Sequence, residues 1–325
     1  MTEQKYGTIV YWHTLSPGLA IFRLMPQPGT SFPSYEAGQY ASLKRENCRL
    51  TKRIGTQSDG RPIYGPELDE SGKQKLGSVI HSYSIASAPY ETETQGYLEF
   101  FLIRERNVGF PGRLTESLFS MDLKNDNSVE YLNEIGGEFT VSRRAAESKH
   151  ILFVGTGTGL APFAAMIKQL HYEAQSSDRR YTLIHTNRTF DELGYHTEMQ
   201  AIEAAGKIDF LYIPTVSRPT QRDLEDPKLG VGRANNVLRK ILDMSLKEEE
   251  DLQDMARKGE DILEAKRTLD HVIKPELPKS VALQTVRQRM NASETVIFSC
   301  GNFQAMADIK YAAEKNQIRF EKEDW

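Results

Sequence analysis

A buried strand followed by a glycine-rich turn and a helix constrains this chain more than any other feature. Residues 150–154, His-Ile-Leu-Phe-Val, form a continuous apolar run, as in a strand covered on both faces of a sheet. Gly155-Thr-Gly-Thr-Gly-Leu-Ala-Pro162 follows directly, and a helical pattern then spans residues 162–175. This order of strand, turn and helix predicts one unit of a parallel α/β sheet.

The glycine turn also predicts a phosphate-binding site. Glycines let the backbone approach a pyrophosphate, and the helix N-terminus presents free N–H groups and a positive dipole end. Pro162 suits the first helical turn, although it stands where the usual Gly-x-Gly-x-x-Gly pattern has its last glycine. A turn that uses glycine for purely steric reasons is the alternative.

Strands and helices alternate over residues 148–325. Further strands are predicted at 181–186, 208–216, 295–300 and 318–321, and helices at 197–205 and 304–315. The alternation predicts an α/β doubly wound parallel sheet. A helical insertion at about 235–290 interrupts it, with apolar residues spaced by three, four and seven: Leu252, Met255, Ile262, Leu269 and Val272. The insertion is either a solvated helical segment or a docking element for a partner.

Residues 1–147 predict a separate antiparallel β domain. Short strands are expected at 5–14, 19–25, 40–44, 79–85 and 97–104, with Gly, Pro and Ser clusters between them. This pattern favours a barrel or a sandwich. Residues 49–77 are polar and rich in glycine and charge, so a long surface loop is predicted there. A hinge is expected near residues 143–149.

The composition excludes several classes of protein. Hydrophobic residues make up 39% and charged residues 26%, and no apolar run approaches the roughly 18 to 20 residues of a membrane-spanning helix. The net charge of −4 gives no general attraction to nucleic acid. Cys48 and Cys300 are too few for a disulfide scaffold, an iron–sulfur cluster or a Cys-rich zinc module, so no metal is expected. Because the first residues carry no apolar export signal, a cytoplasmic location is expected.

Three arginines suggest which dinucleotide would bind. Arg188 and Arg218 follow predicted strands at their carboxyl ends, where ligands bind in such sheets, and Arg233 comes shortly after. Arginine forks suit a phosphate better than a neutral ribose hydroxyl. The arrangement predicts a 2′-phosphate clamp and hence NADP(H), unless these are three scattered surface arginines.

Two further motifs lie in the β domain. His81-Ser-Tyr-Ser84 ends an apolar strand, and Gly112-Arg-Leu-Thr115 leads into a helix-like stretch with Thr115 as a candidate N-cap. Other motifs follow in order along the chain: the glycine turn, Val216-Ser-Arg218, Cys300-Gly-Asn-Phe303 and the terminal Trp325. In this series the chain resembles the ferredoxin–NADP(+) reductase family, which pairs an FAD-binding β-barrel with an NADP-binding α/β domain.

The resemblance implies non-covalent FAD. Tyr83 would lie against the flavin ring, and the Ser84 hydroxyl would reach flavin N5. The family's FAD contacts fall on His81, Ser82, Tyr83, Ser84, Leu102, Ile103, Gly112, Arg113, Leu114, Thr115 and Trp325. Since His81 replaces the family's arginine, Arg113 or Arg104 would have to supply the missing charge.

The resemblance also implies hydride transfer from NADPH. Cys300 would lie beside the nicotinamide C4, and Trp325 would cover the flavin face until the nicotinamide displaces it. Catalytic roles are thus expected for Ser84, Cys300, Glu323 and Trp325. The family's NADP contacts fall on Thr156, Gly157, Thr158, Gly159, Arg188, Ser217, Arg218, Arg233, Cys300, Gly301 and Asn302.

The partner implied by the resemblance is a one-electron protein carrier. A ferredoxin or flavodoxin, both acidic, would suit a basic cluster at the start of the predicted loop, formed by Lys44, Arg45, Arg49, Lys52 and Arg53. A solvated loop explains the same charges. Two other functions stay open, namely a reductase that feeds an oxygenase and a flavin-bearing subunit of a larger electron-transfer complex.

Overall fold

The chain folds into two compact units, Met1–Glu138 and Phe139–Trp325. The computed structural model describes residues 3–56, 62–104, 106–107, 110–111, 113–174 and 178–323, and for 106–107 and 110–111 the backbone alone. The boundary expected at 147/148 falls inside the second unit, because Phe139 packs on Phe163 and Phe298 of that unit, with ring centroids 5.9 and 5.0 Å away. The region expected as a hinge overlaps the last two residues of helix α3 (Val141–Arg144).

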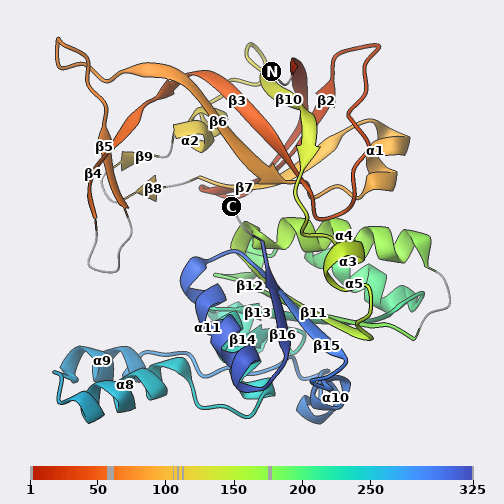
Figure 1. Ribbon diagram of the computed structural model, residues 1–325, viewed down its shortest axis with the longest axis vertical. Helices are drawn as coiled ribbons and strands as arrows, with labels where there is room; N and C mark the ends of the chain where they lie inside the picture. Colours follow the sequence, from red (N-terminus) through yellow and green to blue (C-terminus); the bar gives the residue numbers. More distant parts are fainter. Residues whose placement is uncertain are drawn as a thin grey trace. The chain divides into compact units, whose positions relative to one another are not determined.

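The first unit is an antiparallel six-stranded sheet in the order β6-β3-β10-β1-β2-β7 (Figure 1). Its strands are β1 (Gln4–Ser16), β2 (Leu19–Pro26), β3 (Tyr40–Arg49), β6 (Leu76–Ser84), β7 (Leu98–Ile103) and β10 (Ser128–Gly136). The two edges meet just after β6, where Ile85 bridges Phe100 and the Ala86 N–H donates to the Glu99 carbonyl. The predicted antiparallel β-barrel is confirmed, and β10 is a strand that the sequence patterns did not reveal.

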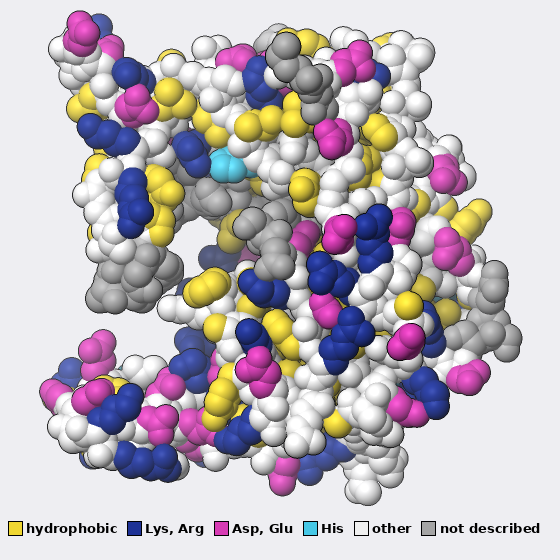
Figure 2. Space-filling model, viewed as in Figure 1, with side chains coloured by type: hydrophobic (Ala, Val, Ile, Leu, Met, Phe, Trp, Pro, Cys, Tyr) yellow, Lys and Arg dark blue, Asp and Glu magenta, His cyan; other side chains and the backbone are white. Residues whose placement is uncertain are grey.

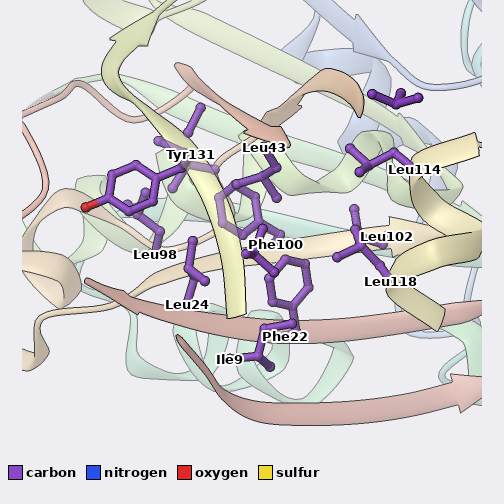
Figure 3. Packing of buried hydrophobic residues seen from close by; sticks show 14 of the residues in the cluster. Ile9, Phe22, Leu24, Leu43, Leu98, Phe100, Leu102, Leu114, Leu118 and Tyr131 are labelled. Carbon is purple, nitrogen blue, oxygen red and sulfur yellow. The ribbon is translucent and has the colours of Figure 1, made fainter. Parts of the chain in front are cut away.

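Alternating side chains fill the interior of this barrel. Phe22, Leu43, Phe100 and Tyr131 point inward from different strands (Figure 3). Helix α2 (Arg113–Phe119) adds Leu114 and Leu118 to the same core, and α1 (Pro89–Gln95) precedes β7. Since α2 begins at Arg113, Thr115 lies in its first turn and the prediction that it is the N-cap is wrong.

The prediction of a long surface loop at residues 49–77 is also wrong. Strand β3 continues to Arg49 and β6 begins at Leu76, and between them β4 (Thr51–Thr56) and β5 (Pro62–Pro66) form a two-stranded antiparallel hairpin. Neither face of the hairpin is covered by a core, and Ile54 is 61% exposed. Its residues therefore lack the alternation of buried and exposed positions on which strand prediction depends. A further short ladder joins β8 (Arg106–Asn107) and β9 (Phe110–Pro111).

The second unit confirms the predicted doubly wound sheet. Six parallel strands run in the order β14-β13-β12-β11-β15-β16. They are β11 (His150–Thr156), β12 (Arg180–Asn187), β13 (Asp209–Val216), β14 (Gly230–Val231), β15 (Thr295–Cys300) and β16 (Arg319–Lys322). β11 lies between β12 and β15, so its apolar run is buried on both faces.

Helices cover both faces of this sheet (Figure 1). They are α4 (Ala161–Glu173), α5 (His196–Ala205), α6 (Gln221–Glu225), α7 (Ala234–Ile241), α10 (Leu283–Arg289) and α11 (Phe303–Lys315), with 3₁₀ turns η1 (Gly157–Leu160) and η2 (Phe190–Glu192). Phe153 of β11 contacts Phe163 of α4, whereas Leu152 and Val154 face the core made with α7 and α11. Among the described residues, no helix is both long and apolar enough to cross a membrane.

The charged segment at 235–290 divides into two parts. Helix α7, in which the predicted insertion would begin, belongs to the sheet's own core through Val237, Leu238 and Ile241. The segment that departs from the alternation is a helical hairpin of α8 (Lys247–Lys258) and α9 (Leu263–Asp270). Acidic and basic side chains interleave on its surface (Figure 2).

Candidate functional site

The glycine turn lies against the end of strand β15. A Cβ on Gly159 would be 2.2 Å from the Cys300 carbonyl oxygen, and one on Gly301 would be 2.2 Å from Thr156 Oγ1. The Asn302 N–H donates to the same Thr156 hydroxyl, at 2.7 Å. The structure thus brings two predicted groups together at the carboxyl ends of β11 and β15, namely Thr156, Gly157, Thr158 and Gly159 with Cys300, Gly301 and Asn302.

Gly157 has a different role in the turn. Its φ is +58°, and no atom lies within 4 Å of the position of a Cβ. This backbone is left-handed and faces open space. The turn therefore combines a tightly packed glycine with an open one, and the open side leaves room for a ligand.

Replacing Gly159 with alanine is expected to destabilise the second unit. The new methyl group would meet backbone atoms of residues 300 and 301, which cannot rotate away, so the cost is about 1 to 3 kcal/mol or more. Urea unfolding measures the change. Gly18→Ala is the control, since its nearest contact would be at 3.9 Å, and it should change stability by no more than about 0.5 kcal/mol. Equal midpoints for Gly159→Ala and the wild type would contradict the prediction.

Cys300 forms a buried pair with Glu323. Its Sγ lies 3.0 Å from Glu323 Oε2, and both side chains are almost inaccessible to water. Burial raises the pKa of the Cys300 thiol well above its usual value, and the adjacent Glu323 carboxylate raises it further. At neutral pH the thiol therefore keeps its proton and donates it to Glu323. Trp325 lies outside the described residues.

The three predicted arginines lie at neighbouring strand ends. The Arg218 N–H donates to the Arg188 carbonyl at 2.8 Å, which joins the ends of β13 and β12. The Gly232 N–H donates to the Val216 carbonyl at 2.9 Å, so Arg233 follows closely at the start of α7. The hydroxyl of Ser217 donates to the Asn187 carbonyl, at 3.2 Å.

The guanidinium groups differ in their partners. Arg188 makes a two-point pair with the buried Glu192, with Nε 2.7 Å from Oε2. Arg233 Nη1 lies 3.1 Å from Oε1 of the buried Glu248. Arg218 is exposed and makes no ion pair with any residue that the structure describes. It is therefore the arginine most available to an anionic ligand.

Sequence reasoning missed the two carboxylates that hold these arginines. Glu192 follows Arg188 by four residues, and oppositely charged residues at that spacing can pair within one helical turn. This spacing could have predicted the pair. Glu248 belongs to helix α8 and reaches Arg233 from outside its own element. No local spacing predicts that contact.

In the first unit, the predicted residues of β6 lie beside α2. Arg113 Nη2 is 3.3 Å from His81 Nε2, so a guanidinium stands next to the histidine that replaces the family's arginine. Arg104 instead faces Glu116, at 4.0 Å. Ser82 shares a hydrogen bond with Ser42 at 3.0 Å, and Ser84 is buried at the end of β6.

The other residues expected to contact FAD differ in their burial. Leu102 and Leu114 are buried in the barrel core (Figure 3), so their side chains are used for packing. Ile103 is exposed, Thr115 is buried and Tyr83 is half-buried. Gly112 lies outside the described residues. Any contact of Leu102 or Leu114 with a ligand would involve the backbone, as the resemblance implies for residues 112–115.

Three of the five residues of the predicted basic cluster are paired with acidic side chains. Lys44 pairs with Glu130 at 2.8 Å, Arg45 with Asp126 at 2.6 Å and Arg49 with Glu116 at 3.5 Å. Lys52 and Arg53 make no ion pair within the described ranges, and both are exposed on β4. Figure 2 shows Lys and Arg side chains beside hydrophobic ones on the protruding β4–β5 hairpin.

Comparisons with known proteins agree with this two-unit architecture. Residues 153–256 match the family model described as an oxidoreductase NAD-binding domain. A ferredoxin–NADP reductase of Azotobacter vinelandii is 30% identical over 201 residues, which cover 57% of this chain and 63% of the relative. A second, from Pseudomonas aeruginosa, is 27% identical and is matched over 70% of this chain and 71% of its own length.

A solved structure extends the likeness of the fold to nearly the whole chain. The ferredoxin NADP+ reductase from Neisseria gonorrhoeae, solved with bound FAD and NADP, superposes with a TM-score of 0.60 at 16% identity and covers 99% of both chains. The glycine turn, the Cys-Gly-Asn segment and the β-barrel occur here in one continuous order. By its motifs, its fold and these relatives, the chain resembles the ferredoxin–NADP(+) reductase family.

Proposed function

We propose that this chain is a flavoprotein reductase that uses FAD to exchange electrons between NADPH and a one-electron protein carrier such as ferredoxin or flavodoxin. The observation that carries the proposal is that the glycine turn, packed on the Cys300 segment, and Arg218 all lie at the carboxyl ends of strands of the same parallel sheet. This end of the sheet suits a dinucleotide, because ligands bind at the carboxyl ends of parallel strands.

The residues of the second unit fit NADP(H). Gly157 leaves open space at the turn, and Arg218 offers a guanidinium that pairs with none of the described residues and could bind a 2′-phosphate. Thr156, Thr158, Gly159 and Ser217 stand beside them as proposed contacts. Arg188 and Arg233 would keep their carboxylate partners and offer their remaining N–H groups.

The residues of the first unit fit FAD. Arg113, held against His81, supplies a guanidinium at the position where the family's arginine is missing. Residues 112–115 would bind the pyrophosphate through backbone N–H groups, and Tyr83 and Ser84 would meet the flavin ring. When bound there, FAD would supply the chemistry that links two-electron hydride transfer to one-electron transfer.

Cys300 and Glu323 would hold the nicotinamide in place. The protonated thiol presents no charge to the ring, and its hydrogen bond to Glu323 orients the sulfur. Trp325 would cover the flavin, as the resemblance implies, and would have to move aside for the nicotinamide. The basic residues left for an acidic carrier are Lys52 and Arg53 on the β4–β5 hairpin.

Purified protein is expected to be yellow and to release FAD when denatured. No motif places a cysteine or histidine for covalent attachment, so the flavin should remain in the supernatant after acid precipitation. Chromatography identifies it against FAD and FMN standards. Recovery of FMN alone, or of no flavin after reconstitution with FAD, would refute the cofactor proposal.

The activity is tested by steady-state oxidation of NADPH and NADH with ferredoxin, flavodoxin or an oxygenase iron–sulfur component as acceptor. The proposed function predicts faster turnover with NADPH and reduction of ferredoxin or flavodoxin. Reduction of the oxygenase component alone would assign the chain to an oxygenase system. Failure to oxidise NADPH even with a dye acceptor would favour a non-catalytic subunit.

A further inference from the structure

A carboxylate of the helical hairpin holds one of the proposed nucleotide arginines. Glu248, in the first turn of α8, is only 7% exposed and lies 3.1 Å from Nη1 of Arg233. We infer that Glu248 is a positioning residue for Arg233 and that the α8–α9 hairpin thereby contributes to selectivity for the 2′-phosphate. The inference rests on the proposed NADP(H) function.

Glu248 is itself held from a second side. Asn236 Nδ2 of α7 donates to Glu248 Oε2 at 2.8 Å, and the Lys247 N–H donates back to Asn236 Oδ1 at 3.0 Å. The carboxylate is therefore a fixed acceptor between α7 and α8. Only one N–H of Arg233 is used by it, and the guanidinium side chain is 65% exposed, so the other donors face solvent.

The same first turn of α8 also anchors the hairpin to the parallel sheet's own helices. Glu250 Oε2 accepts from the buried Arg239 at 2.9 Å, and Glu250 Oε1 accepts from Lys315 of α11 at 3.0 Å. These contacts place the first turn of α8 independently of Arg233. The α8–α9 hairpin therefore holds the Glu248 carboxylate in position whether or not Arg233 contacts it.

Positioning should outweigh the negative charge that Glu248 adds near the site. An arginine side chain loses rotamer freedom when it is fixed, and a partner that already holds it in place removes that cost from ligand binding. The charge of Glu248 is already balanced by Arg233, and Asn236 satisfies its second oxygen with a hydrogen bond. Loss of the carboxylate should therefore weaken binding of a 2′-phosphate and leave binding of the rest of the nucleotide unchanged.

The test compares 2′,5′-ADP with 5′-AMP by calorimetric titration of the full-length FAD-loaded protein. Glu248→Gln should weaken binding of 2′,5′-ADP about three- to tenfold, a coupling typical of residues in one ion-pair network, with no change for 5′-AMP. In an Arg233→Ala background the same substitution should have no effect. Asp254→Asn is the control on the same helix, since this exposed carboxylate pairs with Arg257 on the surface of α8 and removes one charge without touching Glu248, and it should bind both ligands like the wild type.

Several outcomes would overturn the inference. They are unchanged or tighter binding of 2′,5′-ADP by Glu248→Gln, equal losses for both ligands, and a loss that persists without Arg233. Should Glu248→Gln fail to fold, Asn236→Ala removes the second support of the carboxylate and should weaken 2′,5′-ADP selectively. Binding of 2′,5′-ADP no tighter than 5′-AMP by the wild type would overturn the NADP(H) proposal together with the inference, whereas failure of the variants alone leaves that proposal intact.

Discussion

Replacing Arg218 with alanine is expected to raise the KM for NADPH roughly 10- to 150-fold and to leave the KM for NADH nearly unchanged. A charge-assisted hydrogen bond to a phosphate contributes about 1.5 to 3 kcal/mol, which corresponds to that range. Arg218 should carry the largest share, because it is exposed and no described residue neutralises it. Arg188 and Arg233 already face Glu192 and Glu248, so their replacement should have smaller effects on NADPH.

Steady-state kinetics with both nucleotides and one dye acceptor measures this effect. Arg257→Ala is the charge-matched control, since this exposed arginine pairs only with Asp254 on the surface of α8, and its KM values should equal those of the wild type. An equal loss with NADPH and NADH would show that Arg218 supports the structure of the strand end. A larger loss with Arg188→Ala than with Arg218→Ala would refute the ranking.

Replacing Arg239 with alanine is expected to destabilise the second unit by about 3 to 5 kcal/mol, because it leaves a buried carboxylate without its cation. The Arg239 side chain is 2% exposed and contacts Asp308 at two points, Nε–Oδ2 at 2.9 Å and Nη2–Oδ1 at 2.6 Å. It also reaches Glu250 and the Ser245 carbonyl. After the substitution, Asp308 would retain the 2.8 Å bond from Asn235 as its one hydrogen bond among the side-chain contacts described.

Urea unfolding followed by far-UV circular dichroism checks this prediction. The double substitution Arg239→Met with Asp308→Leu should recover much of the loss, because it removes both charges and keeps apolar volume. Arg257→Ala should change stability by no more than about 0.5 kcal/mol. An Arg239→Ala protein that unfolds at the wild-type urea concentration would mean that the pair is dispensable.

Local sequence patterns were enough for the elements that repeat a simple rule. The run at residues 150–154 is apolar throughout because β11 lies between two parallel strands and two layers of helices. Gly157 meets a local requirement, since its backbone is left-handed, whereas Gly159 is needed because of a tertiary contact with residues 300 and 301. Motif order then led to the family that the chain resembles and to the two folds.

Elements without a buried face could not be predicted from these local patterns. The β4–β5 hairpin has no core on either side, so nothing in its sequence alternates with period two. Conversely, α7 resembles the charged segment that follows it, yet it packs in the core of the sheet through Val237 and Leu238. Charge composition alone does not separate a core helix with one apolar stripe from a solvated one.

By itself the sequence determined the two-domain β and α/β architecture, the glycine turn and the candidate residues, since these follow from periodicity and from motifs a few residues long. Only the tertiary structure decided which cations remain available to a ligand. Lys44, Arg45 and Arg49 are paired internally, and Arg233 is held by a residue of another helix, whereas Arg218 makes no such pair among the described residues. The physical reason is that an ion pair depends on a separation of a few ångströms between side chains, which chain folding sets across any distance in sequence.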